Sequence, residues 1–390
     1  MRFPQLRDAF LSVSRGGEGA AAIDDVWFWQ RAVSPHMAYL AEALAQRGFN
    51  VVYVTEIALA EDRERQGWPM LEPRDVRLVV APTKPQIRDL IEGAAAGSVH
   101  LCQGLMRNGM VAYAQSRLAK RGLQQWVLME TVKDSGISGL LRRLAYQYSF
   151  FVKKSGIQGV LAIGHRTPDW VGDRGIATAR IVPFAYFLKD VCLDISGVRV
   201  GARYNFVFVG QFVKRKRLSL LLDALSELRD YDFGLKVIGA GPLEMELRRM
   251  GLKMLGDRVE WIGVVPMDDV LNHVARADCL VLPSAHDGWG AVVSEALMVG
   301  TPAVCSDACG CAAVVTSSGY GGVFGTDDYR GLVCLLRTVI SRGRLIDEER
   351  HALAAWARCL GATRGGEYLQ EILAASNTEH SRPTPPWAID

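Results

Sequence analysis

Two acidic residues on either side of a glycine-rich turn carry the clearest chemistry in this sequence. The segment 286–302 reads HDGWGAVVSEALMVGTP, and its acids are Asp287 and Glu295. Glycines directly before a helix let backbone N–H groups approach an anion, and the amino terminus of the helix adds partial positive charge. If the helix begins near Gly290, Glu295 lies in its second turn, within reach of a ribose, and Asp287 lies nearer the sugar. This predicts a sugar-nucleotide site; the alternative is that Asp287 caps the helix and Glu295 is an exposed helix acid.

A basic loop earlier in the chain is a candidate for binding a diphosphate. Gly210 and Gln211 follow an apolar run that ends at Val209, and the sequence KRKR at 214–217 opens the next helical stretch. Basic side chains over a helix amino terminus bind phosphate through charge and backbone N–H groups together. Lys216 is therefore a candidate phosphate ligand, and the alternative is a solvated basic turn.

A second glycine-rich loop, GAGP at 239–242, follows an apolar run that ends at Ile238. Its glycines, Gly239 and Gly241, permit a close approach between the backbone and a ligand. Glycines after strands often only form turns, so this loop indicates a ligand site chiefly in combination with the other two loops.

Strands and helices alternate along the chain, and this alternation must position the loops. Short apolar runs are separated by stretches with helical spacing of apolar residues. The runs lie at 26–29, 51–54, 77–80, 99–102, 126–129, 160–163 and 180–183, and then at 206–209, 235–238, 259–262, 279–282 and 303–305. Alternation of this kind predicts α/β architecture with parallel sheets covered by helices on both faces. Ligands of such sheets bind beyond the carboxyl ends of the strands, where the candidate loops lie.

The pattern weakens between residues 184 and 201, which divides the chain into two doubly wound, Rossmann-like domains facing a cleft. We expect a flexible leader at 1–24, an amino-terminal domain at 25–188 and a linker at 189–203. A carboxy-terminal domain follows at 204–376, with a disordered tail at 377–390. The last helix of the second domain is expected to pack back on the first.

Composition limits the class of protein. The chain has 390 residues, 49% of them hydrophobic, which suffices for two cores. A net charge of +3 suits contact with phosphates or a membrane surface and falls short of a nucleic-acid footprint, so no nucleic-acid partner is expected. The eight cysteines lack Cys-x-x-Cys spacing and no Asp-x-Asp cluster suggests a divalent cation site, so no metal site is expected. With no run of about 18 apolar residues, we expect a soluble cytoplasmic protein that works at the inner face of the membrane.

The second half resembles the nucleotide-binding domain of the family-4 glycosyltransferases, which are retaining GT-B enzymes of glycosyl transferases group 1. Four elements match in order over about residues 205–315. They are VGQ at 209–211 with Lys216, IGAGP at 238–242, VEWIG at 259–263, and LPS at 282–284 running into the two-acid motif and GTP at 300–302.

This resemblance implies roles for particular residues. Lys216 would neutralise the diphosphate and act in catalysis with Asp287, and Glu295 would hold the ribose hydroxyls. The donor would also contact Gly210, Gln211, Gly239, Gly241, Gly288, Trp289 and Gly290. Two positions depart from the family pattern: Gln211 stands where an arginine is usual, and Asp287 where a glutamate is common. Phosphate charge must then come from Lys216, helped by Lys214 or Arg215.

The first half resembles the family only in outline. The resemblance places an acceptor-side loop at His36, which follows Ser34 and Pro35; His36 could equally cap the helix or be half buried. Gln103 and Glu130 follow strands and face the same cleft by topology. Basic pairs at 142–143 and 153–154 flank an apolar stretch at 146–151 that could touch a lipid-diphosphate acceptor; a solvated amphipathic helix is the alternative.

The activity implied is transfer of a sugar from a UDP- or GDP-linked donor to an acceptor hydroxyl, with retention and without a cofactor or metal. A glycan or lipid-linked acceptor in surface polysaccharide, lipopolysaccharide or other glycoconjugate assembly follows from the family. The alternatives are a catalytically silent or regulatory nucleotide-sugar-binding protein and a sugar-nucleotide epimerase. A phosphorylase is disfavoured because no lysine has a cofactor-type setting, and a dehydrogenase because no Gly-x-Gly-x-x-Gly follows the first strand.

Overall fold

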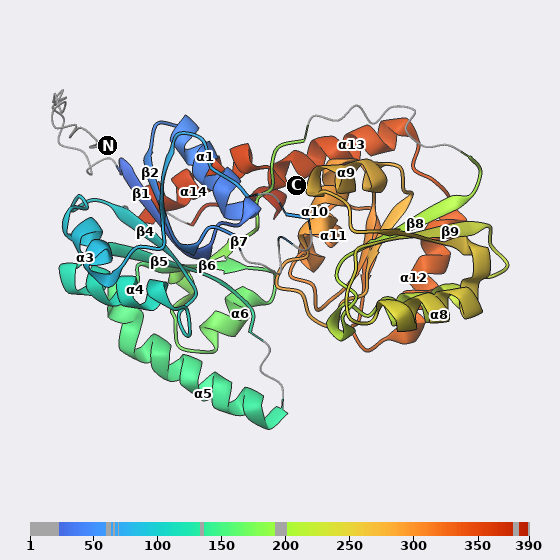
Figure 1. Ribbon diagram of the computed structural model, residues 1–390, viewed down its shortest axis with the longest axis horizontal. Helices are drawn as coiled ribbons and strands as arrows, with labels where there is room; N and C mark the ends of the chain where they lie inside the picture. Colours follow the sequence, from blue (N-terminus) through green and yellow to red (C-terminus); the bar gives the residue numbers. More distant parts are fainter. Residues whose placement is uncertain are drawn as a thin grey trace, which may run out of the picture.

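The structure is a computed structural model that describes residues 23–59, 64, 67–68, 70–132, 136–191, 201–376 and 382–388. These residues form two α/β domains side by side (Figure 1). The expected leader at 1–24 lies almost wholly outside the described residues, as does most of the expected linker at 189–203.

The amino-terminal domain is built on a seven-stranded parallel sheet with the order β3-β2-β1-β4-β5-β6-β7. Its strands are β1 (Asp25–Ala32), β2 (Asn50–Ile57), β3 (Val76–Val80), β4 (Val99–Gln103), β5 (Gln124–Glu130), β6 (Gly159–Ile163) and β7 (Ile181–Phe184). Its helices are α1 (Pro35–Gln46), α3 (Lys84–Glu92), α4 (Met110–Arg121), α5 (Gly136–Lys153) and α6 (Thr167–Gly172). The interior strand β1 has a continuous apolar run, Val26 to Trp29, and all four residues are buried because helices cover both faces of the sheet.

The carboxy-terminal domain repeats this plan with a six-stranded parallel sheet of order β10-β9-β8-β11-β12-β13. Its strands are β8 (Tyr204–Val209), β9 (Phe233–Ile238), β10 (Val259–Gly263), β11 (Cys279–Leu282), β12 (Ala303–Ser306) and β13 (Gly321–Phe324). Its helices are α7 (Leu218–Ser226), α8 (Glu244–Leu255), α9 (Met267–Ala275), α10 (Ala291–Met298), α11 (Ala312–Ser317), α12 (Tyr329–Arg342) and α13 (Asp347–Ala357). The order reverses at β8, so the loops after β8 and β11 open a crevice at this switch point. Two Rossmann-like domains are thus present, as the sequence predicts.

The last helix, α14 (Ala362–Ser376), returns to the amino-terminal domain and packs on α1 (Figure 1). The helices approach closely where Gly366 faces Ala43, since a Cβ atom at Gly366 would lie 3.1 Å from that of Ala43. The Tyr368 hydroxyl donates to the carbonyl of Pro183 at 2.9 Å, which fastens α14 to β7. The amino-terminal domain therefore includes a segment from the far end of the chain.

Residues 382–388 differ from the disordered tail expected at 377–390. Trp387 is only 8% exposed, and its ring packs 6.2 Å from that of Tyr368 on α14 and 6.2 Å from that of Trp289 in the other domain. A large aromatic side chain gains enough from burial to hold a segment that composition alone marks as a poor core former. The expectation of disorder is wrong for these seven residues; positions 377–381 and 389–390 lie outside the described ones.

Candidate active site

A cavity of about 770 Å³ lies between the two domains. Its carboxy-terminal wall is made by the loops after β8, β9, β10 and β11 and by the start of α10. Twelve of the thirteen residues predicted for the site line it: His36, Glu130, Gly210, Gln211, Lys216, Gly239, Gly241, Asp287, Gly288, Trp289, Gly290 and Glu295. Segments far apart in the sequence thus meet in one cleft.

Lys216 and Asp287 form an ion pair in the cavity wall. The Lys216 Nζ donates to Asp287 Oδ2, and the side chains are only 12% and 14% exposed. The Ser284 hydroxyl donates to the same oxygen at 3.5 Å. Gly290 is the N-cap residue of α10 and no side chain caps this helix, so Asp287 does not act as its cap. The lysine charge is already balanced, and a bound phosphate would compete with Asp287 for it.

Glycines let the loops of this wall pack against one another. Gly239 has a φ of 130°, and a Cβ atom there would lie 2.1 Å from the carbonyl oxygen of Gly210. Gly290 has a φ of 95°, which turns the chain into α10. The glycine at 239 is thus required by its neighbouring loop, whereas the sequence suggested an approach to a ligand.

Glu295 lies in the second turn of α10, as its spacing predicts, and it lines the cavity. Although the residue is partly exposed to the cleft, loss of water around its carboxyl raises the pKa of Glu295 to about 7. Near neutral pH both the protonated and the ionised form of the carboxyl are therefore populated. Either form can hydrogen-bond a sugar hydroxyl.

The amino-terminal wall is an aromatic cluster around a single acid. The Tyr186 hydroxyl donates to Glu130 Oε1 at the end of β5, and the His36 ring stacks on Tyr186 with 4.8 Å between centroids. The Trp68 ring also contacts the His36 ring, in an edge-on arrangement with 5.9 Å between centroids. His36 is buried and does not cap α1, because the hydroxyl of Ser34 accepts the Met37 N–H in that role.

Glu130 reaches across the cleft to the donor-side loop. A Cβ atom at Gly288 would lie 1.8 Å from Glu130 Oε2, so any side chain there would push this carboxylate out of its position. A second bridge lies nearby, where the backbone N–H of His165 donates to the Gly310 carbonyl at 3.0 Å and the Arg166 side chain pairs with Asp307 at 2.7 Å. The two domains are joined directly beside the site.

Gln103 is the predicted residue that the structure places elsewhere. It is exposed, does not line the cavity, and its Oε1 accepts the backbone N–H of Arg31 at 2.8 Å. The Gln103 side chain thus bonds a backbone group of the neighbouring strand β1. The prediction that Gln103 faces the cleft is wrong. Tyr186 and Trp68, which the sequence reasoning did not assign to the site, are aromatic residues in segments without clear periodicity.

Residues 198–358 match the protein family described as glycosyl transferases group 1. This match covers less than half of the chain, so what it shows is a similarity of this segment to the family. The match begins at the linker and ends with α13, so it contains every donor-side residue predicted from the sequence.

Curated glycosyltransferases match part of the chain. The lipopolysaccharide 1,6-galactosyltransferase of Escherichia coli is 26% identical over 196 residues, or 49% of this chain and 54% of that protein. An uncharacterised glycosyltransferase of Methanocaldococcus jannaschii is 32% identical over 121 residues, covering 31% of this chain and 33% of the other. The chain therefore spans between about a third and about half of these two relatives.

Solved structures match over most of the chain and show the fold. A lipopolysaccharide outer core galactosyltransferase, WaaB, aligns with a TM-score of 0.66 at 16% identity, covering 88% of this chain and 98% of that one. HepE of Anabaena, solved in complex with UDP, gives a TM-score of 0.66 at 13% identity, with 90% and 100% covered. The fold is GT-B, as the resemblance implies.

Proposed function

We propose that this protein transfers a sugar from a nucleotide diphosphate sugar to an acceptor hydroxyl with retention of anomeric configuration. The observation that carries the proposal is the cleft itself, in which the Lys216–Asp287 pair, the amino terminus of α10 and Glu295 face Glu130 of the other domain. The match of residues 198–358 to a glycosyltransferase family supports it. The complex of the HepE neighbour with UDP supports a nucleotide donor, UDP- or GDP-linked.

In this proposal the donor lies against the carboxy-terminal wall. Its diphosphate takes the place of Asp287 beside Lys216 and meets the backbone N–H groups that begin α10. Arg215, an exposed cation on the rim, adds positive potential and takes part of the role of the arginine replaced by Gln211. Glu295 bonds the ribose hydroxyls.

In the chemical step, the bond between the anomeric carbon and the diphosphate oxygen breaks and a bond from that carbon to the acceptor oxygen forms. The acceptor oxygen attacks the anomeric carbon on the face from which the diphosphate leaves, and its proton passes to the departing phosphate. Preorganised positive charge at Lys216 and α10 stabilises the developing diphosphate, so no metal ion or cofactor is required. Asp287, released from the lysine, faces the donor sugar, and the acceptor enters past Glu130 and Tyr186.

The acceptor in this proposal is a glycan or a lipid-linked saccharide of surface polysaccharide or lipopolysaccharide assembly. The name of the Escherichia coli relative, a lipopolysaccharide galactosyltransferase, supports this class. Among the described residues no helix has the length and apolar character needed to cross a bilayer. We propose that the protein meets its acceptor at the inner face of the membrane.

Thermal-shift screening against UDP- and GDP-sugars, followed by nucleotide release, tests the donor proposal. We expect one nucleotide sugar to raise the melting temperature, and Lys216→Ala and Asp287→Ala to abolish turnover, with chelator present or absent. Lys253→Ala, which removes an exposed lysine of α8, is the matched control and should behave as the parent. Binding of NADH without binding of any nucleotide sugar would overturn the proposal. Donor binding without turnover for any acceptor would instead support a silent nucleotide-sugar-binding protein.

A further inference from the structure

Helix α5 exposes a continuous apolar face. Of the fourteen large hydrophobic side chains that are exposed among the described residues, seven lie on or at this single helix. They are between 51% and 86% exposed: Ile137, Leu140, Leu141, Leu144, Tyr148, Phe151 and Val152. At 100° per residue they fall within an arc of about 120°. We call these seven residues the docking face.

The opposite side of α5 holds the helix on its domain. Phe150 and Gly139 are buried, and the Tyr146 ring packs edge-on against Trp170 of α6 at 5.1 Å. Lys153 Nζ donates to the carbonyl of Leu105 at 2.8 Å. Because the inner side is satisfied in this way, the docking face is a second apolar surface that the domain core does not use.

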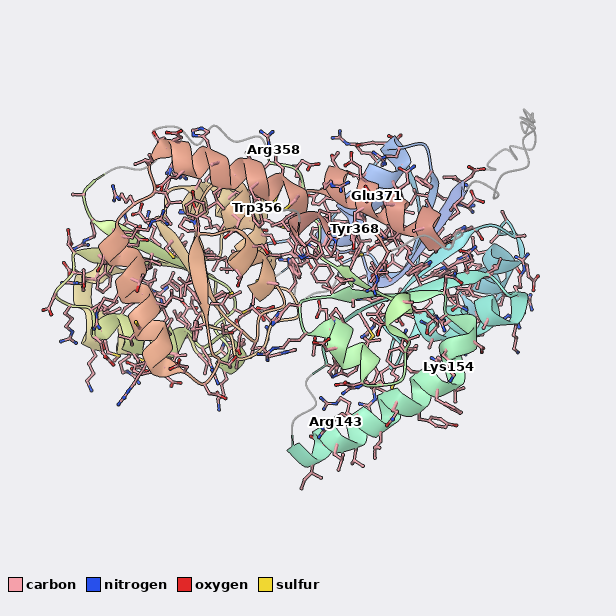
Figure 2. All side chains as sticks on the ribbon, turned by 180° about the vertical axis from the view of Figure 1, so that it is seen from behind. Arg143, Lys154, Trp356, Arg358, Tyr368 and Glu371 are labelled. Atoms are coloured by element: carbon pink, nitrogen blue, oxygen red, sulfur yellow. The ribbon has the colours of Figure 1, made fainter. Side chains whose placement is uncertain are left out.

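The charged side chains on and next to α5 are all positive. The segment 136–154 contains Arg142, Arg143, Lys153 and Lys154 and no acidic residue. Arg143 lies in the first half of the helix and Lys154 directly follows its end (Figure 2). The Lys154 ammonium sits 5.0 Å from the ring of Phe151, so cation and apolar surface are presented together.

We propose that α5 docks the protein on an anionic lipid bilayer, with the docking face entering the acyl boundary and Arg143 and Lys154 meeting the phosphate headgroups. Helices that lie in the boundary between headgroups and acyl chains carry leucine and aromatic residues on one face and cations beside that face. A protein partner, including a second copy of this chain, would fit less well because lysines are depleted at protein interfaces and the helix offers no acid to pair with its own cations.

The position of α5 links this surface to the cleft, an extension that rests on the proposed function. Glu130 ends β5 at the cavity, and α5 begins six positions later at Gly136. That end of α5 is the one nearer the carboxy-terminal domain (Figures 1 and 2). A bilayer on the docking face would therefore lie against the helix that follows the Glu130 wall of the cavity, and we infer that it presents a lipid-linked acceptor to that wall.

Co-flotation with vesicles tests the docking. The full chain is mixed with vesicles of phosphatidylcholine alone or phosphatidylcholine with phosphatidylglycerol, at low and high salt. We expect binding to the mixed vesicles, with Leu141→Gln combined with Leu144→Gln lowering the bound fraction at least about ten-fold. Arg143→Gln combined with Lys154→Gln should weaken binding and reduce its dependence on salt.

The control pair is Met245→Gln with Leu252→Gln on α8, whose side chains are 75% and 73% exposed in the other domain. It should bind vesicles as the parent does. The docking proposal would be overturned if the parent did not bind vesicles, or if the control pair lost as much vesicle binding as the α5 variants. It would also be overturned if the parent bound no vesicles but formed a dimer that the α5 variants convert to a monomer. The rise in melting temperature with the nucleotide sugar is measured in parallel and should be unchanged in the α5 variants. Its absence in every protein would refute the proposed donor site and leave the vesicle result standing.

Discussion

Replacement of Glu295 by glutamine should change how stability depends on pH. The folded protein raises the pKa of Glu295 from its ordinary 4.5 to about 7, because the carboxyl loses water on α10. The folded state thus holds this proton more tightly than the unfolded chain does. The free energy of unfolding contributed by this group is present below pH 4.5 and is lost as the pH rises through about 7. A difference of this size in pKa corresponds to about 3 kcal/mol.

Urea unfolding, followed by tryptophan fluorescence at about pH 5 and about pH 8, measures this effect. Glu295→Gln should unfold much like the parent at the lower pH and be more stable than it by up to about 3 kcal/mol at the higher one. Glu246→Gln, at an exposed acid of α8, is the matched control and should follow the parent at both values. If Glu295→Gln loses the same free energy between the two pH values as the parent, the carboxyl is not desolvated and the reasoning is refuted.

Three further substitutions test the cleft and the packing around it. Lys216→Met leaves the Asp287 carboxylate, whose side chain is only 14% exposed, without its cation. We expect a loss of up to about 3 kcal/mol in urea unfolding together with loss of nucleotide release, and unchanged unfolding would contradict the ion pair. Gly288→Ala places a methyl group on the Glu130 carboxylate and should lower turnover and the free energy of unfolding by about 1–2 kcal/mol, and parent-like turnover would show that the two do not meet. Trp387→Ala should cost about 3 kcal/mol in the same measurement, and a loss below about 0.5 kcal/mol would mean that the ring is not packed.

The sequence predicts the donor wall well because its residues follow directly from strand ends. Gly210, Gly239 and Asp287 each come after a short apolar run, and parallel strands bring their carboxyl ends to one edge of a sheet. Glu295 is placed by helical periodicity alone. These arguments need only the order of elements, which hydrophobic patterning carries.

The opposite wall is harder to predict because it depends on side-chain direction and on how two domains meet. Gln103 ends a strand just as Glu130 does, yet it turns to its neighbouring strand and Glu130 turns to the cleft. Tyr186 belongs to the site only because its hydroxyl meets Glu130 from another segment. The burial of Trp387 likewise depends on Trp289 and Tyr368, both remote in sequence. Nothing local to these residues encodes such contacts.

The return of α14 to α1 has a consequence for synthesis on the ribosome. The α1 surface around Ala43 and the carbonyl of Pro183 receive their partners, Gly366 and Tyr368, from a segment made more than 180 residues later. The first domain to be translated is therefore the last to be completed, and it must wait with part of its apolar surface uncovered while the second domain folds. A fragment cut at the linker would carry this same defect permanently, so expression of residues 25–188 alone should give an aggregation-prone protein, and joining α14 to that fragment should rescue it.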